Sequence, residues 1–187
     1  MPAVCVFCSS SLTIDGRYLD LADRVGAGIA ERGWGLVSGA GSISMMGALA
    51  RSARAGGGHT VGVIPDALVA MEVADHDSDE FIVTRDMRQR KGIMDERSDA
   101  FLALPGGIGT LEELIEAWTA RSLNMHHKPV VVLDPWGDFD HLHALLGHWV
   151  QQGFVRSEAV DHVHWATDVD DALDAIAGAW STAPPFG

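Results

Sequence analysis

A glycine-rich segment of this chain has the composition of an anion-binding loop. Pro105-Gly106-Gly107-Ile108-Gly109-Thr110 leads from an apolar run directly into a helical pattern. Glycine lets the backbone approach a ligand closely, and the first N–H groups of a helix point at one small volume that the helix dipole favours for anions. The segment can therefore bind a phosphate, with the Thr110 hydroxyl as a further donor. The alternative is a tight turn in which Thr110 is only the N-cap of the helix.

Acidic residues follow this segment, and Glu113 stands three positions after Thr110. Thr-x-x-Glu is the capping-box pattern, in which the carboxylate only accepts a hydrogen bond from the N-cap amide. The helix dipole also favours acidic residues in the first turn. A bound phosphate would compete for the same amides, however, and would leave the carboxylate of Glu113 to face a sugar. A capping role and a catalytic role for Glu113 both stay open at this point.

A second candidate segment, Asp86-Met87-Arg88-Gln89-Arg90-Lys91, opens a predicted helix with cations. Met87, Arg90 and Lys91 share one face, because residues three and four positions apart are neighbours on a helix. The run is either a solvated basic face or part of a site for a small anion. Cations at a helix N-terminus oppose its dipole, and locally unfavourable choices concentrate at functional sites, which favours the anion site.

Three further patterns do not indicate a cofactor. Ser38–Gly47 lacks the G-x-G-x-x-G spacing of a dinucleotide site, because Ser44 stands where the last glycine is required. Cys5 and Cys8 form a lone C-x-x-C in an expected strand, where alternation sends the two thiols to opposite faces and favours simple packing. The acidic run Asp75–Glu80 lacks the sixth-position glycine of a calcium loop and is interpreted as a solvated acidic loop.

The elements that must position these segments alternate between strand and helix. Short apolar or β-branched runs predict buried strands at Ala3–Cys8, Gly35–Ser38, Thr60–Ile64, Phe81–Thr84, Ala100–Leu104, Pro129–Leu133 and His162–Ala166. Helical patterns lie at Asp15–Arg32, Ser44–Ala55, Met87–Ser98, Thr110–Leu123, Phe139–Gln152 and Asp168–Trp180. This alternation predicts an α/β fold, with a doubly wound, mainly parallel sheet covered by helices on both faces. In such sheets ligands bind outside the carboxyl ends of the strands, where the glycine-rich segment is expected.

Length and charge limit the possible functions. The 187 residues fit one domain, expected over residues 1–180, with a fraying tail over residues 181–187. The net charge of −13 repels nucleic acids, and no apolar run reaches the ~20 residues of a membrane span. The chain has two cysteines and no basic segment that would begin a signal peptide, so we expect it in the cytoplasm.

Three segments together, Ser38–Gly47, Met87–Lys91 and Pro105–Glu113, resemble the Lonely Guy (LOG) family in order and spacing. These proteins are cytokinin riboside 5′-monophosphate phosphoribohydrolases, and some of their relatives were labelled lysine decarboxylases. The similarity runs from about Val4 to Val155. It implies a Rossmann-like fold, usually a homodimer, that hydrolyses AMP or N6-prenyl-AMP to the free base and ribose 5-phosphate without metal or organic cofactor.

The resemblance also implies roles for individual residues. The family's catalytic arginine and glutamate fall on Arg90 and Glu113. Its substrate contacts fall on these two and on Glu72, Met87, Lys91, Gly107, Ile108, Gly109, Thr110, Leu111, Glu112 and Thr119. One family loop, Y-G-G-G-S-x-G-L-M-G, differs here, with Ser38, Ala40, Ser44 and Met45 in place of tyrosine, glycine, glycine and leucine.

Cleavage of a glycosidic bond builds positive charge on the sugar and negative charge on the leaving base. We expect the Gly107–Thr110 stretch to bind the 5′-phosphate, Glu113 to stabilise the ribose cation and orient water, and Arg90 to hydrogen-bond the base or the ribose. Glu72 would hold a ribose hydroxyl. The alternative is a carrier or sensor that binds a nucleotide without catalysis. Pyridoxal phosphate chemistry is disfavoured, because the chain has only two lysines, Lys91 and Lys128.

Overall fold

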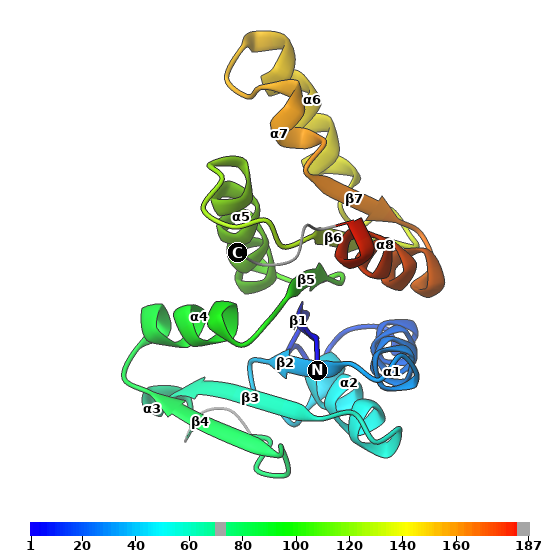
Figure 1. The fold of residues 1–187 in the computed structure, drawn as a ribbon, viewed down its shortest axis with the longest axis vertical. Helices are drawn as coiled ribbons and strands as arrows, with labels where there is room; N and C mark the ends of the chain where they lie inside the picture. The colour runs from blue at the N-terminus through cyan, green and yellow to red at the C-terminus, as the bar shows by residue number, and fades with distance from the viewer. Residues whose placement is uncertain (70–73, 183–187) are drawn as a thin grey trace.

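The structure, a computed structural model, describes residues 1–69 and 74–182, and its strands form one sheet (Figure 1). The strands are β1 (Ala3–Phe7), β2 (Gly35–Ser38), β3 (Thr60–Pro65), β4 (Glu80–Thr84), β5 (Ala100–Ala103), β6 (Val130–Leu133) and β7 (Val163–Ala166). The helices are α1 (Gly16–Glu31), α2 (Ser44–Ala55), α3 (Asp66–Val69), α4 (Met87–Glu96), α5 (Ile108–Ser122), α6 (Asp140–Gln152), α7 (Ser157–Val160) and α8 (Val169–Thr182). Within these ranges, none of the helices has the length and apolar character needed to cross a bilayer.

The sheet has seven parallel strands in the order β4-β3-β2-β1-β5-β6-β7, which confirms the predicted doubly wound topology. The chain builds outward from β1 to β4 and then returns to place β5 on the other side of β1. The strand order therefore reverses between β1 and β5. Connections leave the sheet in opposite directions at such a point, so the crevice for a ligand lies at the carboxyl ends of these strands.

Alternation along the strands builds one hydrophobic core on each face of the sheet. In β1, Val4 and Val6 belong to the core beneath α1, α2 and α8, whereas Cys5 and Phe7 belong to the core beneath α4 and α5. Figure 1 shows the two sets of helices on opposite sides of the sheet. Cys8 lies on the face opposite Cys5, and both thiols are free and buried, which confirms the packing interpretation. Burial raises the pKa of both thiols.

Most predicted elements are present, with ends shifted by a few residues. The four-residue helices α3 and α7 were not predicted, because four residues are too few to display helical periodicity. Helix α8 continues to Thr182, and residues 183–187 lie outside the described part of the chain.

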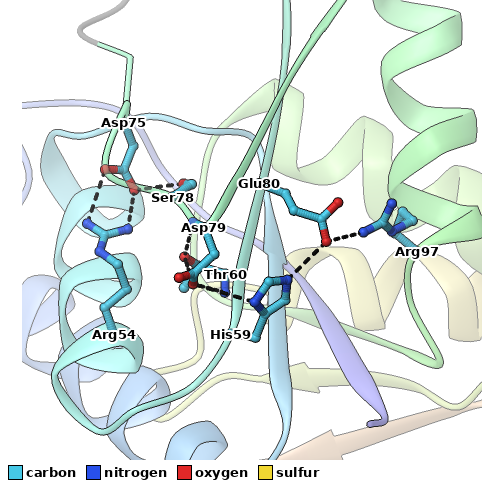
Figure 2. Close-up of polar contacts among 8 residues, drawn as sticks. All are labelled: Arg54, His59, Thr60, Asp75, Ser78, Asp79, Glu80 and Arg97. Atoms are coloured by element: carbon cyan, nitrogen blue, oxygen red, sulfur yellow. Dashed lines mark hydrogen bonds and ion pairs between the residues drawn. The ribbon is translucent and has the colours of Figure 1, made fainter.

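The interpretation of Asp75–Glu80 as a solvated acidic loop holds for the exposed His76, Asp77 and Asp79 but is wrong for Asp75, whose contacts Figure 2 shows. Asp75 is only 4% exposed, and its carboxylate accepts hydrogen bonds of 2.7 and 3.1 Å from both terminal nitrogens of Arg54 on α2. The amide of Asp75 also donates to the carbonyl of Ala40 at 2.8 Å. The acidic run is thus attached to the loop that follows β2.

Two further acids of this run, Asp79 and Glu80, attach β4 to its neighbours. Asp79 accepts hydrogen bonds from the amide and the hydroxyl of Thr60 at 2.8 and 2.9 Å. Glu80 pairs with His59 and with Arg97, so that it links β4 to the start of β3 and the end of α4 (Figure 2). These hydrogen bonds lower the pKa of the Asp79 and Glu80 carboxyls.

Candidate active site

Helices α4 and α5 bring together Arg90 and Glu113, the two residues for which the family resemblance predicts catalytic roles. Nη2 of Arg90 lies 3.8 Å from Oε1 of Glu113, and the two side chains are 9% and 11% exposed. The side chains meet on the face covered by α4 and α5, beside the carboxyl ends of β2 and β3. A buried cation and anion thus face one another in a part of the molecule that excludes most water.

Burial raises the pKa of Glu113 from 4.5 to about 7, although the charge of Arg90 opposes this shift. Glu112 and Glu116 raise the pKa further, and Lys91 lowers it. A carboxyl group with this pKa exists in both protonation states near neutral pH. Such a group suits proton transfer or the activation of water.

The guanidinium of Arg90 is held mainly by neutral groups. Its Nε donates to the carbonyl of Val63 at 3.1 Å, its Nη2 approaches the carbonyl of Gly39 at 3.5 Å, and its Nη1 lies 3.6 Å from Sδ of Met87. Sequence reasoning did not find Val63 or Gly39, because a main-chain acceptor has no side-chain signature. The sequence did offer one sign of a role for residue 39: it is glycine here, as in the loop Y-G-G-G-S-x-G-L-M-G of the family that the chain resembles.

The glycine-rich segment leads into α5 differently from the expected capping box. Gly107 is the N-cap, and no side chain caps the helix, so the interpretation of Thr110 as N-cap with Glu113 as its capping partner is wrong. Thr110 is the third residue of α5 and is buried. The Glu113 carboxylate is therefore not used as a cap, because it lies well inside the helix and faces Arg90.

Open space lies over the start of α5. A Cβ added to Gly107 or Gly109 would meet no atom within 4 Å, whereas a Cβ on Gly106 would lie 2.2 Å from Oγ1 of Thr110. Gly106 is thus needed for packing against the helix, and the two following glycines leave the backbone accessible. An anion can approach the uncapped amides of α5 from this side.

Comparison with known proteins places the chain in a family. The family model described as "Possible lysine decarboxylase" matches residues 46–176. The chain is 53% identical over 174 residues to the cytokinin riboside 5′-monophosphate phosphoribohydrolase of Mycobacterium tuberculosis, covering 93% of this chain and 92% of that protein. It is 41% identical over 156 residues to LOG1 of Arabidopsis thaliana, covering 83% and 73%. The chain belongs to the LOG family.

Solved structures agree with the fold of a LOG protein. The molybdenum cofactor carrier protein of Chlamydomonas reinhardtii superposes with a TM-score of 0.73 at 26% identity, covering 97% of this chain and 99% of that one. A molybdenum cofactor binding protein of Rippkaea orientalis gives a TM-score of 0.72 at 24% identity, covering 95% and 96%. The Rossmann-like fold predicted by the resemblance is therefore confirmed.

The LOG loop after β2 carries two unusual backbone conformations. Ala40 and Ser44 have φ values of 58° and 54°, in the left-handed region that favours glycine. These are the two positions at which the family loop has glycine and this chain does not. The Ser44 hydroxyl donates to the carbonyl of Ser11, so the substituted side chain connects this loop to the loop after β1.

The other predicted substrate contacts of this LOG chain fall into two groups, and the first lies where α4 contacts α5. There Lys91 pairs with Glu112 and Glu116, which raise the pKa of Lys91 although partial burial alone would lower it. Lys91 thus bridges α4 to α5 beside the Arg90–Glu113 pair, and its intramolecular partners are carboxylates.

The second group lies on the outer face of α5. Ile108 is 89% exposed and Leu111 38%, and both line a broad groove that also includes Lys91 and Glu112. Thr119 is exposed six residues beyond Glu113, a rise of about 9 Å along the helix. The chain by itself does not bring Thr119 to the Arg90–Glu113 pair. Glu72 lies outside the described residues.

A cavity of about 180 Å³ lies between α4 and α5 and reaches Glu113. Met94, Phe101 and Ala117 contribute apolar surface to it, and Lys91 lies at its edge. Glu113 therefore borders this cavity as well as Arg90.

Proposed function

We propose that the protein hydrolyses the N-glycosidic bond of adenine-type nucleoside 5′-monophosphates, such as AMP and N6-prenyl-AMP, to the free base and ribose 5-phosphate. The observation that carries this proposal is the buried Arg90–Glu113 pair beside the uncapped, open start of α5. The names of the relatives, cytokinin riboside 5′-monophosphate phosphoribohydrolases, support the same activity.

The reaction breaks the bond between C1′ of the ribose and the base nitrogen, and water supplies a hydroxyl to C1′ and a proton to the base. The amides at residues 107–110 bind the 5′-phosphate and fix the ribose near Glu113. The Glu113 carboxylate stabilises the positive charge that develops on the ribose and orients the attacking water. The Arg90 guanidinium donates hydrogen bonds to the departing base or the ribose.

The test is incubation of the purified protein with AMP and with N6-isopentenyl-AMP, followed by chromatography for the free base. Replacing Glu113→Gln should reduce turnover by at least about 100-fold and spare nucleotide binding, because the carboxylate acts mainly in the transition state. Glu158→Gln, at an exposed position on α7, is the matched control and should keep full activity. Absence of base from both nucleotides with folded wild-type protein would refute the proposal.

A second candidate function is a non-catalytic nucleotide carrier or sensor. The likeness of the fold to a molybdenum cofactor carrier protein favours it. The discriminating result is tight binding of AMP, measured by calorimetry, without any release of base.

We further propose that the protein is a cytoplasmic homodimer, as the family resemblance implies. Support comes from the exposed apolar residues on the outer face of α5, Ile108, Leu111 and Ile115. Thr119 lies on the exposed side of the same helix, so a second copy packed there could bring this predicted substrate contact to its partner's site.

A further inference from the structure

The position of the Arg90 guanidinium is set by main-chain carbonyls at β3 and just after β2 rather than by its acidic partner. Val63 lies in β3, and Gly39 directly follows β2, so two adjacent strands supply the two carbonyl oxygens that Arg90 contacts. The Arg90–Glu113 separation of 3.8 Å is longer than a hydrogen bond. The cation is therefore fixed by rigid main chain and only faces the carboxylate.

The absence of a side chain at Gly39 makes this position possible. A Cβ at residue 39 would lie 1.9 Å from Nη2 and 3.1 Å from Cζ of Arg90. Gly39 is not among the residues with positive φ, so its backbone would accept an L-residue. The requirement for glycine here is the space that the guanidinium occupies, not the conformation of the chain.

Carbonyl acceptors also preserve the charge of the arginine. A second carboxylate in place of these carbonyls would offset the charge of the guanidinium further, whereas a neutral carbonyl dipole orients the guanidinium without adding a negative charge. Preorganised donors aimed at developing negative charge usually make the largest single contribution to catalysis. This arrangement suits a group that must stabilise a leaving base.

We propose that Gly39 is a positioning residue for the reaction, and that its carbonyl and its missing side chain together place Arg90 opposite Glu113. The inference rests on the proposed function. It goes beyond the assignment of Arg90 and Glu113, because it explains what holds the Arg90 side chain of α4 opposite the Glu113 side chain of α5.

The first experiment compares Gly39→Ala with Gly35→Ala in steady-state hydrolysis of AMP or N6-isopentenyl-AMP. Gly35 lies at the other end of β2, is buried, and would place a Cβ at ordinary contact distances of 3.4 Å. We expect Gly39→Ala to lower kcat by about 100-fold, the loss typical of a 1 Å misplacement, with KM changed far less. Gly35→Ala should keep its kcat within about two-fold of the wild type, because its new Cβ would make only ordinary van der Waals contacts, with no atom closer than 3.4 Å. A kcat for Gly39→Ala equal to that of the control would overturn the proposal.

A double-mutant cycle separates this role from a general disturbance of the loop. If Gly39 acts through Arg90, then Gly39→Ala should cause no further loss of kcat in an Arg90→Ala background. Additive losses would mean that residue 39 acts on the substrate or on the loop itself, and would overturn the inference.

Folding provides a second test if Gly39→Ala does not give a soluble protein. Combining it with Arg90→Ala removes the side chain with which the new Cβ collides, so the double variant should recover the wild-type circular dichroism spectrum. Failure to recover would show that the collision lies elsewhere, against the inference. A wild-type protein that releases no base refutes the proposed function, whereas an active wild type with an active Gly39→Ala refutes the positioning role alone.

Discussion

At the scale of single residues, the raised pKa of Glu113, the proposed catalytic carboxyl, also makes the stability of the protein depend on pH. Its pKa is about 7 in the folded protein and 4.5 as an ordinary side chain, so the folded state binds this proton more tightly than the unfolded state. Between these two values the unfolded chain releases the proton first, and the free energy of unfolding falls as the pH rises. The contribution of Glu113 to stability is thus least favourable above pH 7.

Replacing Glu113→Gln should therefore stabilise the protein at pH 8 by up to about 3 kcal/mol and have little effect near pH 4. Glutamine is neutral at both values and occupies a similar volume. Urea denaturation of both proteins at the two pH values measures the difference, with Glu158→Gln as the exposed control. An equal stability change at both pH values would contradict the shifted pKa.

Ser44 offers a separate test of backbone strain. Its φ of 54° disfavours any L-residue, and its hydroxyl bonds to the carbonyl of Ser11. Both Ser44→Ala and Ser44→Gly lose this hydrogen bond, but only glycine also relieves the left-handed strain. We expect Ser44→Gly to be more stable than Ser44→Ala by about 1 kcal/mol in urea denaturation. Equal stabilities would mean that the loop relaxes out of this conformation when the hydroxyl is lost.

At the scale of elements, the ion pair between Arg54 and Asp75 connects the segment before β4 to helix α2. Asp75 also accepts a hydrogen bond from Ser78 at 3.2 Å, and its amide binds Ala40, the neighbour of Gly39. The attachment of this segment thus supports the loop that holds Arg90. Loss of one partner of a buried pair leaves an unpaired charge and costs more than the pair itself contributes.

We therefore expect Asp75→Ala to lower the free energy of unfolding by about 3 kcal/mol. Asp77→Ala, an exposed position in the same acidic run, is the matched control and should change stability by less than about 0.5 kcal/mol. Urea denaturation measures both. If the two variants proved equally stable, the Arg54–Asp75 pair would not be a structural link.

At the scale of the whole molecule, the outer face of α5 is the surface on which the proposed dimer depends. Ile115→Glu places a charge among Ile108 and Leu111 and should dissociate a dimer formed there, because an unpaired buried charge is costly. Sedimentation velocity should find a dimer for the wild type and a monomer for the variant. Val83→Glu, on the edge strand β4, should remain dimeric. A monomeric wild type would refute the dimer, and a dimeric Ile115→Glu would place the interface elsewhere.

The sequence alone determined the order of elements and most of the site. Apolar runs with a period of two or 3.6 residues are local signals, so strands and long helices could be predicted within a few residues. The glycine-rich segment and the basic helix made Glu113, Arg90 and Lys91 candidates, and the family resemblance predicted catalytic roles for Arg90 and Glu113. These periodic patterns and short motifs could be predicted because each depends on residues that are close together in the sequence.

The tertiary structure alone decided which groups meet. It made Gly107 the N-cap of α5, showed that Glu113 does not cap the helix, and buried Asp75 against Arg54. It also supplied the carbonyls of Val63 and Gly39 to Arg90 and the burial that raises the pKa of Glu113. These outcomes depend on partners 21 to 51 residues apart and on exclusion of water, for which no local pattern exists.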